Sequence, residues 1–284
     1  ELARQIVDRL AIRVAEIDRD EDPAGDDIAR VRVDLDHAAG RASGGIMVVA
    51  DLVEAPLAGR HATLWHSPYA EAPVLVARVT TLHDLEVFRA RGRPPLSQQY
   101  YASRSRHAVN HSVALITGAT TLRDEIKSAF APTVGISVIH HGVDDDFRLS
   151  PLIDATDDYA LYFGGYSARK AVDELIAAWP EVYRATGMRL RLVGARQRPS
   201  NGVESLSSVS RSDLRALIDG AACVIYPSAY EGFGLPIVEG IVSNRPVVCR
   251  RVGVVSDLPD DSVIEVGSVT PHELLAAVRT VLSG

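Results

Sequence analysis

The segment from Glu231 to Glu239 reads Glu-Gly-Phe-Gly-Leu-Pro-Ile-Val-Glu and sets two carboxylates around a glycine turn. Gly232 and Gly234 permit a tight turn and the close approach of a ligand, and Pro236 suits the first position of a helix. The N–H groups at such a helix start attract anions, most naturally a phosphate. Because a phosphate repels a carboxylate, Glu231 is expected to bind neutral hydroxyl groups next to it. The pattern therefore predicts a site for sugar hydroxyls that flank a diphosphate.

A basic pair, Arg169 and Lys170, follows a second glycine turn at Gly164 and Gly165. Lys170 is one of only two lysines, so it does not belong to a lysine-rich surface. Cations at a helix start oppose the helix dipole, which makes a purely structural, solvated pair the less favoured interpretation. Two such cations can neutralise a diphosphate and stabilise it as a leaving group.

These residues need strands and helices that bring them to one edge of a sheet. In the second half of the chain, apolar runs predict strands at 159–163, 190–193, 222–226, 247–249 and 263–266, and helices at 171–179, from 212, and at 271–282. In the first half, strands are predicted at 31–35, 46–49, 62–65, 77–82, 113–116 and 136–139, and helices at 96–110 and 121–130. Such alternation predicts α/β domains with parallel sheets, whose ligands bind beyond the carboxyl ends of the strands.

Residues 226–239 resemble the E-x7-E signature of retaining glycosyltransferases of family 4. This resemblance implies the GT-B fold, in which two Rossmann-like, doubly wound parallel-sheet domains face a cleft. It also implies that Glu231 contacts the transferred sugar and that Glu239 contacts the ribose of the nucleotide. The donor sugar and diphosphate would be bound by the backbone of the turn, at Gly232, Phe233, Gly234 and Leu235. An ordinary strand, turn and helix with solvated glutamates is the alternative, which the filled interior of the motif disfavours.

Further positions match the same family. The Gly-Gly turn followed by Arg-Lys implies that Arg169 and Lys170 bind the donor phosphates. Gly165 stands where many members carry an arginine, so the two bases must supply the charge between them. Gly194 ends the next strand, where the family places backbone that lines the nucleotide. His83, at the end of strand 77–82, resembles the histidine that faces the donor sugar, and a structural role for this single histidine stays an open alternative.

The resemblance makes residues 1–146 the acceptor-side domain and residues 147–284 the nucleotide-sugar-binding domain. The boundary is placed in the polar crossover around 140–147. The sequence starts in an amphipathic helix with Leu2, Ile6, Val7 and Leu10 on one face, rather than in a strand. We therefore expect the first strand and the glycine-rich loop of the family to be missing from it.

Composition bounds the partners and the location. The net charge of −7 argues against a nucleic-acid partner. Cys223 and Cys249 lie in separate apolar runs without metal-ligand spacing, which predicts buried thiols. No apolar run reaches the roughly 18 residues of a transmembrane helix, and no signal-peptide pattern is present. We expect a cytoplasmic protein; contact with the inner membrane face through the arginines from Arg89 to Arg106 is less favoured than a solvated surface.

The sequence thus predicts a retaining hexosyltransferase that uses a UDP- or GDP-hexose donor and needs no cofactor and no metal, since no acidic pair suggests one. The acceptor, whether a glycan, a lipid-linked sugar or a small molecule, is not specified by the sequence. Two alternatives stay open: a nucleotide-sugar epimerase of the same architecture and a non-catalytic nucleotide-sugar-binding protein. A dehydrogenase is disfavoured because no G-x-G-x-x-G follows a predicted strand.

Overall fold

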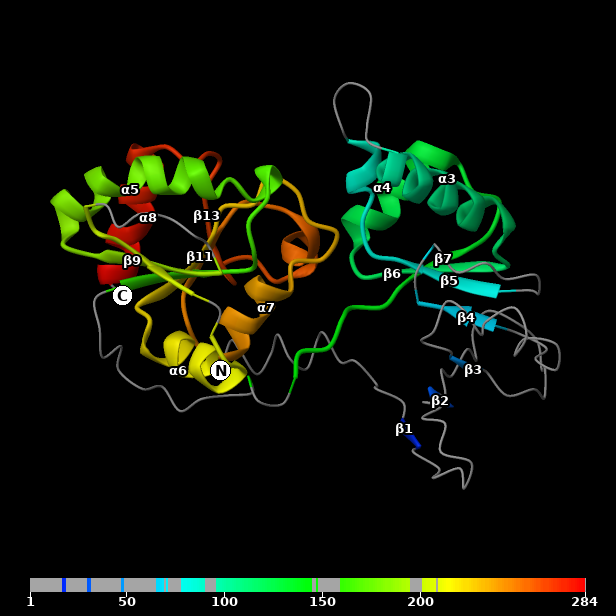
Figure 1. The fold of residues 1–284 in the computed structure, drawn as a ribbon, viewed down its shortest axis with the longest axis horizontal. Coiled ribbons are helices and arrows are strands. Elements are labelled where there is room, and N and C mark those ends of the chain that lie inside the picture. Colours follow the sequence, from blue (N-terminus) through cyan, green and yellow to red (C-terminus); the bar gives the residue numbers. More distant parts are fainter. Residues whose placement is uncertain are drawn as a thin grey trace. The chain divides into compact units, whose positions relative to one another are not determined.

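The computed structural model describes two compact units, one within Ile12–His140 and the other within His141–Gly284 (Figure 1). The described residues are 17–18, 30–31, 47–48, 65–68, 70, 78–89, 96–144, 147, 159–194, 201–207 and 209–283. Each unit contains its own parallel sheet, as the sequence predicted.

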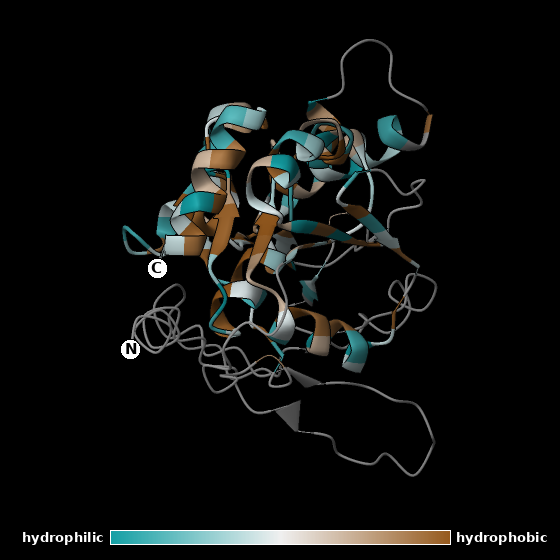
Figure 2. Ribbon diagram, turned by 90° about the vertical axis from the view of Figure 1, so that its left-hand side faces the viewer, coloured by the Kyte–Doolittle hydropathy of each residue, from teal (hydrophilic) through white to brown (hydrophobic). Residues whose placement is uncertain are grey.

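The C-terminal unit is built on a six-stranded, all-parallel sheet in the order β10-β9-β8-β11-β12-β13. Its strands are β8 (Tyr159–Phe163), β9 (Arg189–Val193), β10 (Val203–Leu206), β11 (Cys223–Tyr226), β12 (Val247–Cys249) and β13 (Ile264–Glu265). Every residue of β8, β11 and β12 is buried, as expected of strands covered on both faces. Figure 2 shows hydrophobic strands, coloured brown, between the helices.

The described α-helices of this unit are α5 (Val172–Thr186), α6 (Arg211–Gly220), α7 (Leu235–Val242) and α8 (Pro271–Ser283). The 3₁₀ helices are η4 (Ala168–Lys170) and η5 (Gly253–Asp257). Helix α5 runs past Pro180, although the sequence predicted its end at residue 179. An interior proline removes one hydrogen bond of the helix. The buried face nevertheless continues from Trp179 to Val182, and α5 packs against α8. Gly187, in the left-handed conformation, ends the helix.

Strand β10 was not predicted from the sequence. It pairs in parallel with β9 at the edge of the sheet, from Val203 to Leu206. Only Val203 in this strand is buried. Because Glu204 and Ser205 are polar and an edge strand buries little, its sequence carries no apolar run.

Both cysteines are free and buried, as predicted. Burial raises the pKa of the Cys223 and Cys249 thiols to about 12. Both therefore stay protonated and take part in packing rather than in chemistry.

The N-terminal unit contains a five-stranded parallel sheet in the order β3-β4-β5-β6-β7. Its strands are β3 (Met47–Val48), β4 (Trp65–Ser67), β5 (Arg78–Leu82), β6 (Ala114–Thr117) and β7 (Ile136–Val138). The helices are α3 (Leu96–His111), α4 (Thr120–Phe130) and the 3₁₀ helix η2 (Glu86–Phe88). The predicted helix at residues 2–10 lies outside the described residues. Unlike the parallel strands that we predicted, β2 (Arg30–Val31) pairs antiparallel with β1 (Ile17–Asp18).

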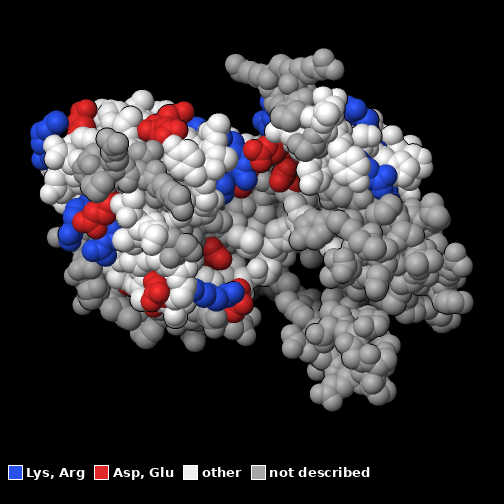
Figure 3. Space-filling model, in the orientation of Figure 1, with Lys and Arg blue, Asp and Glu red and all other residues white. Residues whose placement is uncertain are grey.

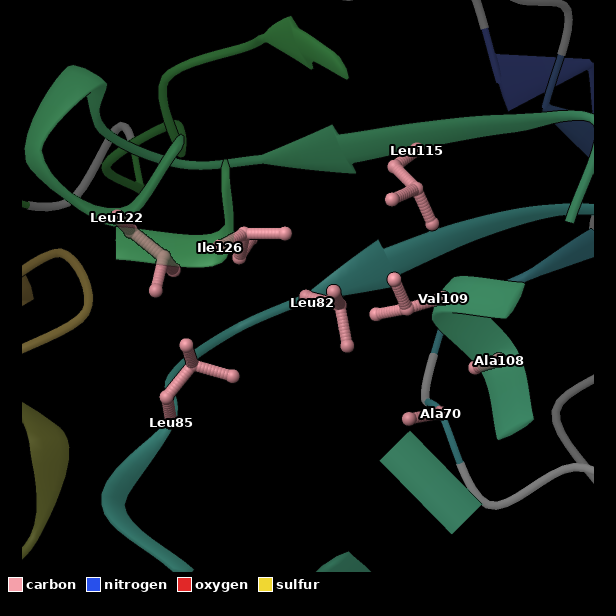
Figure 4. Close-up of a cluster of buried hydrophobic side chains, with 8 residues drawn as sticks. All are labelled: Ala70, Leu82, Leu85, Ala108, Val109, Leu115, Leu122 and Ile126. Atoms are coloured by element: carbon pink, nitrogen blue, oxygen red, sulfur yellow. The ribbon is translucent and has the colours of Figure 1, made fainter. Parts of the chain in front are cut away.

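A hydrophobic core fixes the end of β5 in this unit. Figure 4 shows side chains from β5, β6, α3 and α4 pointing into it. The largest of its fully buried side chains are Leu82, Leu85, Leu115, Leu122 and Ile126. The rings of Phe88 and Phe130 pack edge to face beside it, with centroids 5.0 Å apart. The loop that follows β5 therefore starts from a rigid base.

The two units divide between His140 and His141, whereas the sequence placed the boundary between residues 146 and 147. The intervening segment contacts the C-terminal unit. The ring centroids of His141 and Phe233 lie 4.8 Å apart, and Asp144 pairs with Arg211 at 2.6 Å. Phe147 is buried, which anchors the crossover on the same unit.

Acidic and basic side chains are interspersed on the face seen in Figure 3. Arg89 pairs with Glu125 at 2.8 Å, and the guanidinium of Arg106 lies 5.4 Å from the centroid of the Phe88 ring. Arg91 and Arg93 lie outside the described residues. None of the described helices has the length and the apolar composition needed to cross a bilayer.

Candidate functional site

The order of the strands singles out one place in the C-terminal sheet. From β8 the chain moves outward in one direction through β9 to β10, then returns to β11 and continues the other way to β13. Strands β8 and β11 are neighbours and parallel, so their carboxyl ends meet at the same edge. In open α/β sheets, ligands bind where the strand order reverses in this way. The Gly164 turn follows β8 and the Glu231 turn follows β11.

The side chain of Glu231 is the centre of this place. Its Oε1 atom accepts hydrogen bonds from Arg169 Nη1 at 2.6 Å, Ser228 Oγ at 2.8 Å and Tyr226 OH at 2.9 Å. Lys170 Nζ lies 3.4 Å from the same oxygen. The structure therefore brings together three of the four predicted catalytic residues, namely Arg169, Lys170 and Glu231. Only 10% of the Glu231 side chain is exposed, and a buried carboxylate requires such partners.

The two oxygens of this carboxylate differ. All four contacts fall on Oε1, and Oε2 has no hydrogen bond or ion pair with another described residue. The sequence had assigned the cations to phosphate and the carboxylate to hydroxyls. In the structure they also contact each other, because opposite charges in a half-buried place attract. Two cations against one carboxylate leave the cluster with a net positive charge.

Two tyrosines that the sequence reasoning gave no role complete the cluster. The Tyr226 hydroxyl accepts a hydrogen bond from Lys170 Nζ and donates one to Glu231. The Tyr162 ring stacks on the Tyr226 ring, with centroids 6.0 Å apart. Burial, followed by the Glu231 charge, raises the pKa of both phenols, so both stay protonated donors. Their role could have been predicted from the sequence, because each tyrosine lies near the end of a strand and the two strands are adjacent.

Gly164 is required where the cluster packs against the turn. Its φ is +133°, and a Cβ there would lie 3.0 Å from Tyr226 Cε2 and 3.5 Å from Lys170 Nζ. A side chain at Gly165 would meet open space, although its φ is +76°. The Gly165 carbonyl accepts a hydrogen bond from the Tyr162 hydroxyl at 2.6 Å. Gly164 therefore sets the approach of the basic pair, and Gly165 sets the path of the turn.

The turn from residue 232 to 234 leads into α7 with Gly234 in the left-handed conformation, at φ +98°. Leu235 is the first helical residue and Pro236 the second, one position later than predicted. The Ile237 N–H donates to the Gly234 carbonyl. Within the described part of the chain, no hydrogen bond is donated by the N–H groups of Gly232, Gly234 or Leu235. Unpaired N–H groups at a helix start form a place for an anion.

The loop after β12 holds this turn in shape. The Val254 N–H donates to the Phe233 carbonyl at 2.8 Å, and a Cβ on Gly253 would come within 2.2 Å of that oxygen. On the other side, the ring of His141 packs against the ring of Phe233. The sequence did not predict this role of Gly253, and its only signal was a glycine in the loop after strand β12.

Glu239 lies one turn inside α7, as predicted. Burial raises the pKa of its carboxyl, and the charge of Arg211 partly offsets this. Among the described residues, its carboxylate accepts no hydrogen bond. A half-buried acceptor of this kind can bind a hydroxyl group.

The last predicted residues follow strands β9 and β5. Gly194 comes directly after β9 with φ +79°, and its N–H donates to the Leu206 carbonyl at 3.3 Å. His83 belongs to the N-terminal unit, where it is exposed at the end of β5. Its Nε2 atom lies 2.8 Å from the Pro68 carbonyl oxygen. Because a carbonyl only accepts, Nε2 carries a proton.

The described residues contain no group of three or more histidine, cysteine, aspartate or glutamate side chains placed to hold a metal ion. At the carboxyl ends of β8 and β11, the charged cluster consists of Arg169, Lys170 and Glu231.

Comparison with known proteins finds a family model and several relatives. Residues 157–284 match the family model described as "Glycosyl transferases group 1". The O-antigen chain mannosyltransferase B of Escherichia coli is 28% identical over 244 residues, which cover 74% of this chain and 64% of that protein. The chain thus spans less than two thirds of the length of this curated relative.

Two solved structures show the same fold. Sucrose-phosphate synthase from Thermosynechococcus elongatus matches with a TM-score of 0.65 and 18% identity, over 80% of this chain and 66% of that chain. The Anabaena HepE protein, solved in complex with UDP and glucose, matches with a TM-score of 0.63 and 19% identity, over 78% of this chain and 68% of that chain. The predicted fold class, α/β with parallel sheets of the GT-B type, is confirmed.

Proposed function

We propose that the protein is a retaining glycosyltransferase that moves a hexose from a nucleoside diphosphate sugar to an acceptor hydroxyl, without a metal ion. The observation that carries the proposal is the convergence of Arg169, Lys170 and Glu231 where the strand order reverses. The unpaired N–H groups of the adjacent turn support it. So do the family match of residues 157–284 and the mannosyltransferase relative.

In this proposal the diphosphate lies between the basic pair and the turn at residues 232–235. Arg169 and Lys170 exceed the single carboxylate in charge, so they stabilise the negative charge of the leaving group. Glu231 binds a hydroxyl of the hexose through Oε2, while its Oε1 stays with the cations. Glu239 binds the ribose, the backbone at Gly165 and Gly194 lines the nucleotide, and His83 contacts the hexose from the N-terminal unit.

The reaction is balanced without an added reagent. The bond between C1 of the hexose and the diphosphate oxygen breaks, and its electron pair leaves with the diphosphate. An acceptor hydroxyl oxygen bonds to C1 on the same face, which retains the configuration. Its proton passes to the departing phosphate oxygen, which is on that face.

The donor is a UDP- or GDP-hexose in this proposal. The E. coli relative is a mannosyltransferase by name, and HepE was solved with UDP and glucose. A thermal-shift panel of nucleotide sugars identifies the donor without an acceptor, because a ligand that binds the native state raises its Tm. If no nucleotide sugar raises the Tm, the proposal falls.

Turnover is tested with Glu231→Gln, which keeps the size of the side chain. We expect the wild type to hydrolyse slowly the nucleotide sugar that raises its Tm. The variant should hydrolyse it at a rate lower by a factor of about 10² to 10³. Glu204→Gln is the matched control, because Glu204 also pairs with arginines, at the edge strand β10. Donor binding without any turnover would identify a non-catalytic binding protein, and conversion of the donor to its epimer would identify an epimerase.

Metal independence has its own test. Protein treated with a chelator and desalted should keep its full turnover, because Arg169, Lys170 and the turn supply the positive charge. Turnover that disappears and returns with added Mg²⁺ or Mn²⁺ would contradict this part of the proposal.

We also propose a cytoplasmic location, with a solvated surface in the Arg89–Arg106 region. Contact of this region with the inner membrane face is the less favoured alternative. Leu96 and Tyr100 on α3 are 81% and 56% exposed, and Arg104 and Arg106 lie on the same helix. An interface with anionic lipid would need such apolar and basic side chains on one surface, which makes the alternative testable. Co-sedimentation with phosphatidylglycerol vesicles at low salt measures it, and recovery of the protein in the supernatant would contradict it.

A further inference from the structure

The N-terminal unit contains a cavity of about 460 Å³ directly beyond the carboxyl end of β5. Its walls come from the end of β5, the loop that follows, η2 and one face of α3. This volume falls in the range of pockets for small ligands. The cavity belongs to neither the basic cluster nor the glycine turn of the C-terminal unit.

The floor of this cavity is apolar and well packed. Leu82 and Ala70 line it and also belong to the hydrophobic core, with 2% and 6% of their surface exposed. Figure 4 shows both within the buried cluster. A floor that is part of the core does not need to rearrange when a ligand binds.

The wall formed by α3 presents polar and aromatic groups. Gln98, Tyr101 and Ser105 line the cavity at spacings of three and four residues, which places them on one helix face. Tyr101 is 45% exposed, so its ring is accessible. Its ring packs edge to face with that of Tyr100, at 5.8 Å between centroids. An aromatic ring packs against the C–H face of a pyranose, and an amide both donates to and accepts from its hydroxyls.

The charges of the lining are acidic. Asp84 and Glu86 line the cavity, and the described lining contains no lysine or arginine. Asp84 is held in place because its Oδ1 accepts the Glu86 N–H at 2.9 Å. Carboxylates accept hydrogen bonds from hydroxyl groups and repel phosphate. The cavity therefore favours a polyhydroxy ligand without negative charge.

We propose that this cavity binds the acceptor, and that the acceptor group it holds is an uncharged saccharide. This inference rests on the proposed glycosyl transfer and specifies its second substrate. His83 also lines the cavity, so the acceptor sits beside the residue assigned to the transferred hexose. A phosphate on the acceptor, if there is one, lies outside the cavity.

Saturation-transfer difference NMR on the full chain tests the assignment. The probes are methyl α-D-mannopyranoside and methyl α-D-glucopyranoside, each compared with mannose 6-phosphate or glucose 6-phosphate. We expect saturation of a neutral glycoside at least about tenfold stronger than that of its phosphate. Equal saturation of neutral and phosphorylated sugars, or no saturation of either neutral glycoside, would overturn the proposal.

Variants locate the binding. Tyr101→Ala should abolish the glycoside signal, and Tyr101→Leu, which keeps apolar bulk, should weaken it. Asp84→Asn combined with Glu86→Gln should admit the phosphates and remove most of the tenfold preference. Asp124→Asn is the control, an acid on α4 that pairs with Arg123 away from the cavity. A glycoside signal that survives both Tyr101 substitutions would overturn the assignment.

Donor binding separates this inference from the proposed function. If a nucleotide sugar still raises the Tm while no glycoside binds, only the acceptor assignment fails. If no nucleotide sugar binds at all, the proposed function fails. A glycoside signal that is displaced by the donor would show that the cavity holds the donor hexose, which also overturns the acceptor assignment.

Discussion

At the end of β11 in the C-terminal unit, two cations and two hydroxyls surround one buried carboxylate. At the end of β5 in the N-terminal unit, two exposed carboxylates line a cavity beside an accessible tyrosine. Both places lie at carboxyl ends of parallel strands, so the fold supplies the same location twice. The loops decide the chemistry there. In the two proposals above, one set of loops binds a diphosphate and the other binds neutral hydroxyl groups.

The largest expected effect comes from removing positive charge from the C-terminal place. Arg169→Gln should lower kcat/KM by about 10³, because one of the two groups that stabilise the leaving diphosphate is lost. Steady-state kinetics with the donor found in the panel measures this. Arg123→Gln, which removes an arginine paired with Asp124 in the N-terminal unit, should leave kcat/KM unchanged. A wild-type kcat/KM for Arg169→Gln would contradict the proposal that the cluster in the C-terminal unit stabilises the leaving diphosphate.

A change at Gly253 acts on the backbone of the turn instead of its charge. The Cβ of Gly253→Ala would overlap the Phe233 carbonyl oxygen. The variant should therefore lower kcat/KM by a factor of about 10², and it should also lower the free energy of unfolding. Gly187→Ala separates the two causes, since Gly187 also has a positive φ but has open space around it. We expect about 1 kcal/mol of destabilisation for Gly187→Ala and clearly more for Gly253→Ala. Urea unfolding measures both, and equal losses would contradict the overlap.

His83 tests whether the two places serve one reaction. His83→Asn should lower kcat by about tenfold to a hundredfold, because a contact with the hexose is lost. Donor binding in the thermal-shift assay should not change. His111→Asn, on α3, is the control, since its Nδ1 atom contacts the carbonyl of His107 and its ring stacks on the His107 ring, both within the same helix. An unchanged kcat for His83→Asn would separate the N-terminal place from the chemistry.

Tyr226→Phe makes a smaller change in the C-terminal cluster. It removes the hydroxyl between Lys170 and Glu231 and keeps the ring stacked on Tyr162. We expect a loss of about tenfold in kcat/KM with a small change in Tm. Tyr159→Phe removes a buried hydroxyl bonded to the Leu217 carbonyl in the same unit and should leave kcat/KM unchanged. If both variants lower kcat/KM by the same factor, the Tyr226 hydroxyl contributes no more to the reaction than the Tyr159 hydroxyl.

The smallest expected effect is that of Glu239→Gln on the pH dependence of the free energy of unfolding. Burial raises the pKa of this carboxyl above its ordinary value near 4.5 in the folded state. The folded state then holds the proton more tightly, so its free energy of unfolding falls as pH rises from about 4.5 through the raised pKa. Glu239→Gln should lose this dependence and be slightly more stable than the wild type at neutral pH, because no charged carboxylate is then buried. Urea unfolding of both proteins from pH 4 to 8 measures it, and parallel pH profiles would contradict the assignment.

The motif and most strands of the C-terminal unit could be predicted from the sequence, because buried parallel strands such as Tyr159–Phe163 are continuous apolar runs between glycine turns. Strand β10 could not, because an edge strand with Glu204 and Ser205 carries no such run. The convergence of Arg169, Lys170 and Glu231 followed from the topology. The links through Tyr226 and Gly253 did not, because they depend on packing between segments far apart in the chain.

The contact between Gly253 and Phe233 has a consequence for exchanging donor preference between relatives. The shape of the 231–234 turn is imposed partly from outside, by a backbone that arrives after β12. A chimera that imports only the motif segment would have the sequence of the turn but not the loop after β12 that fixes its conformation. The graft should span residues 226–255, so that the turn and the loop that shapes it are inherited together.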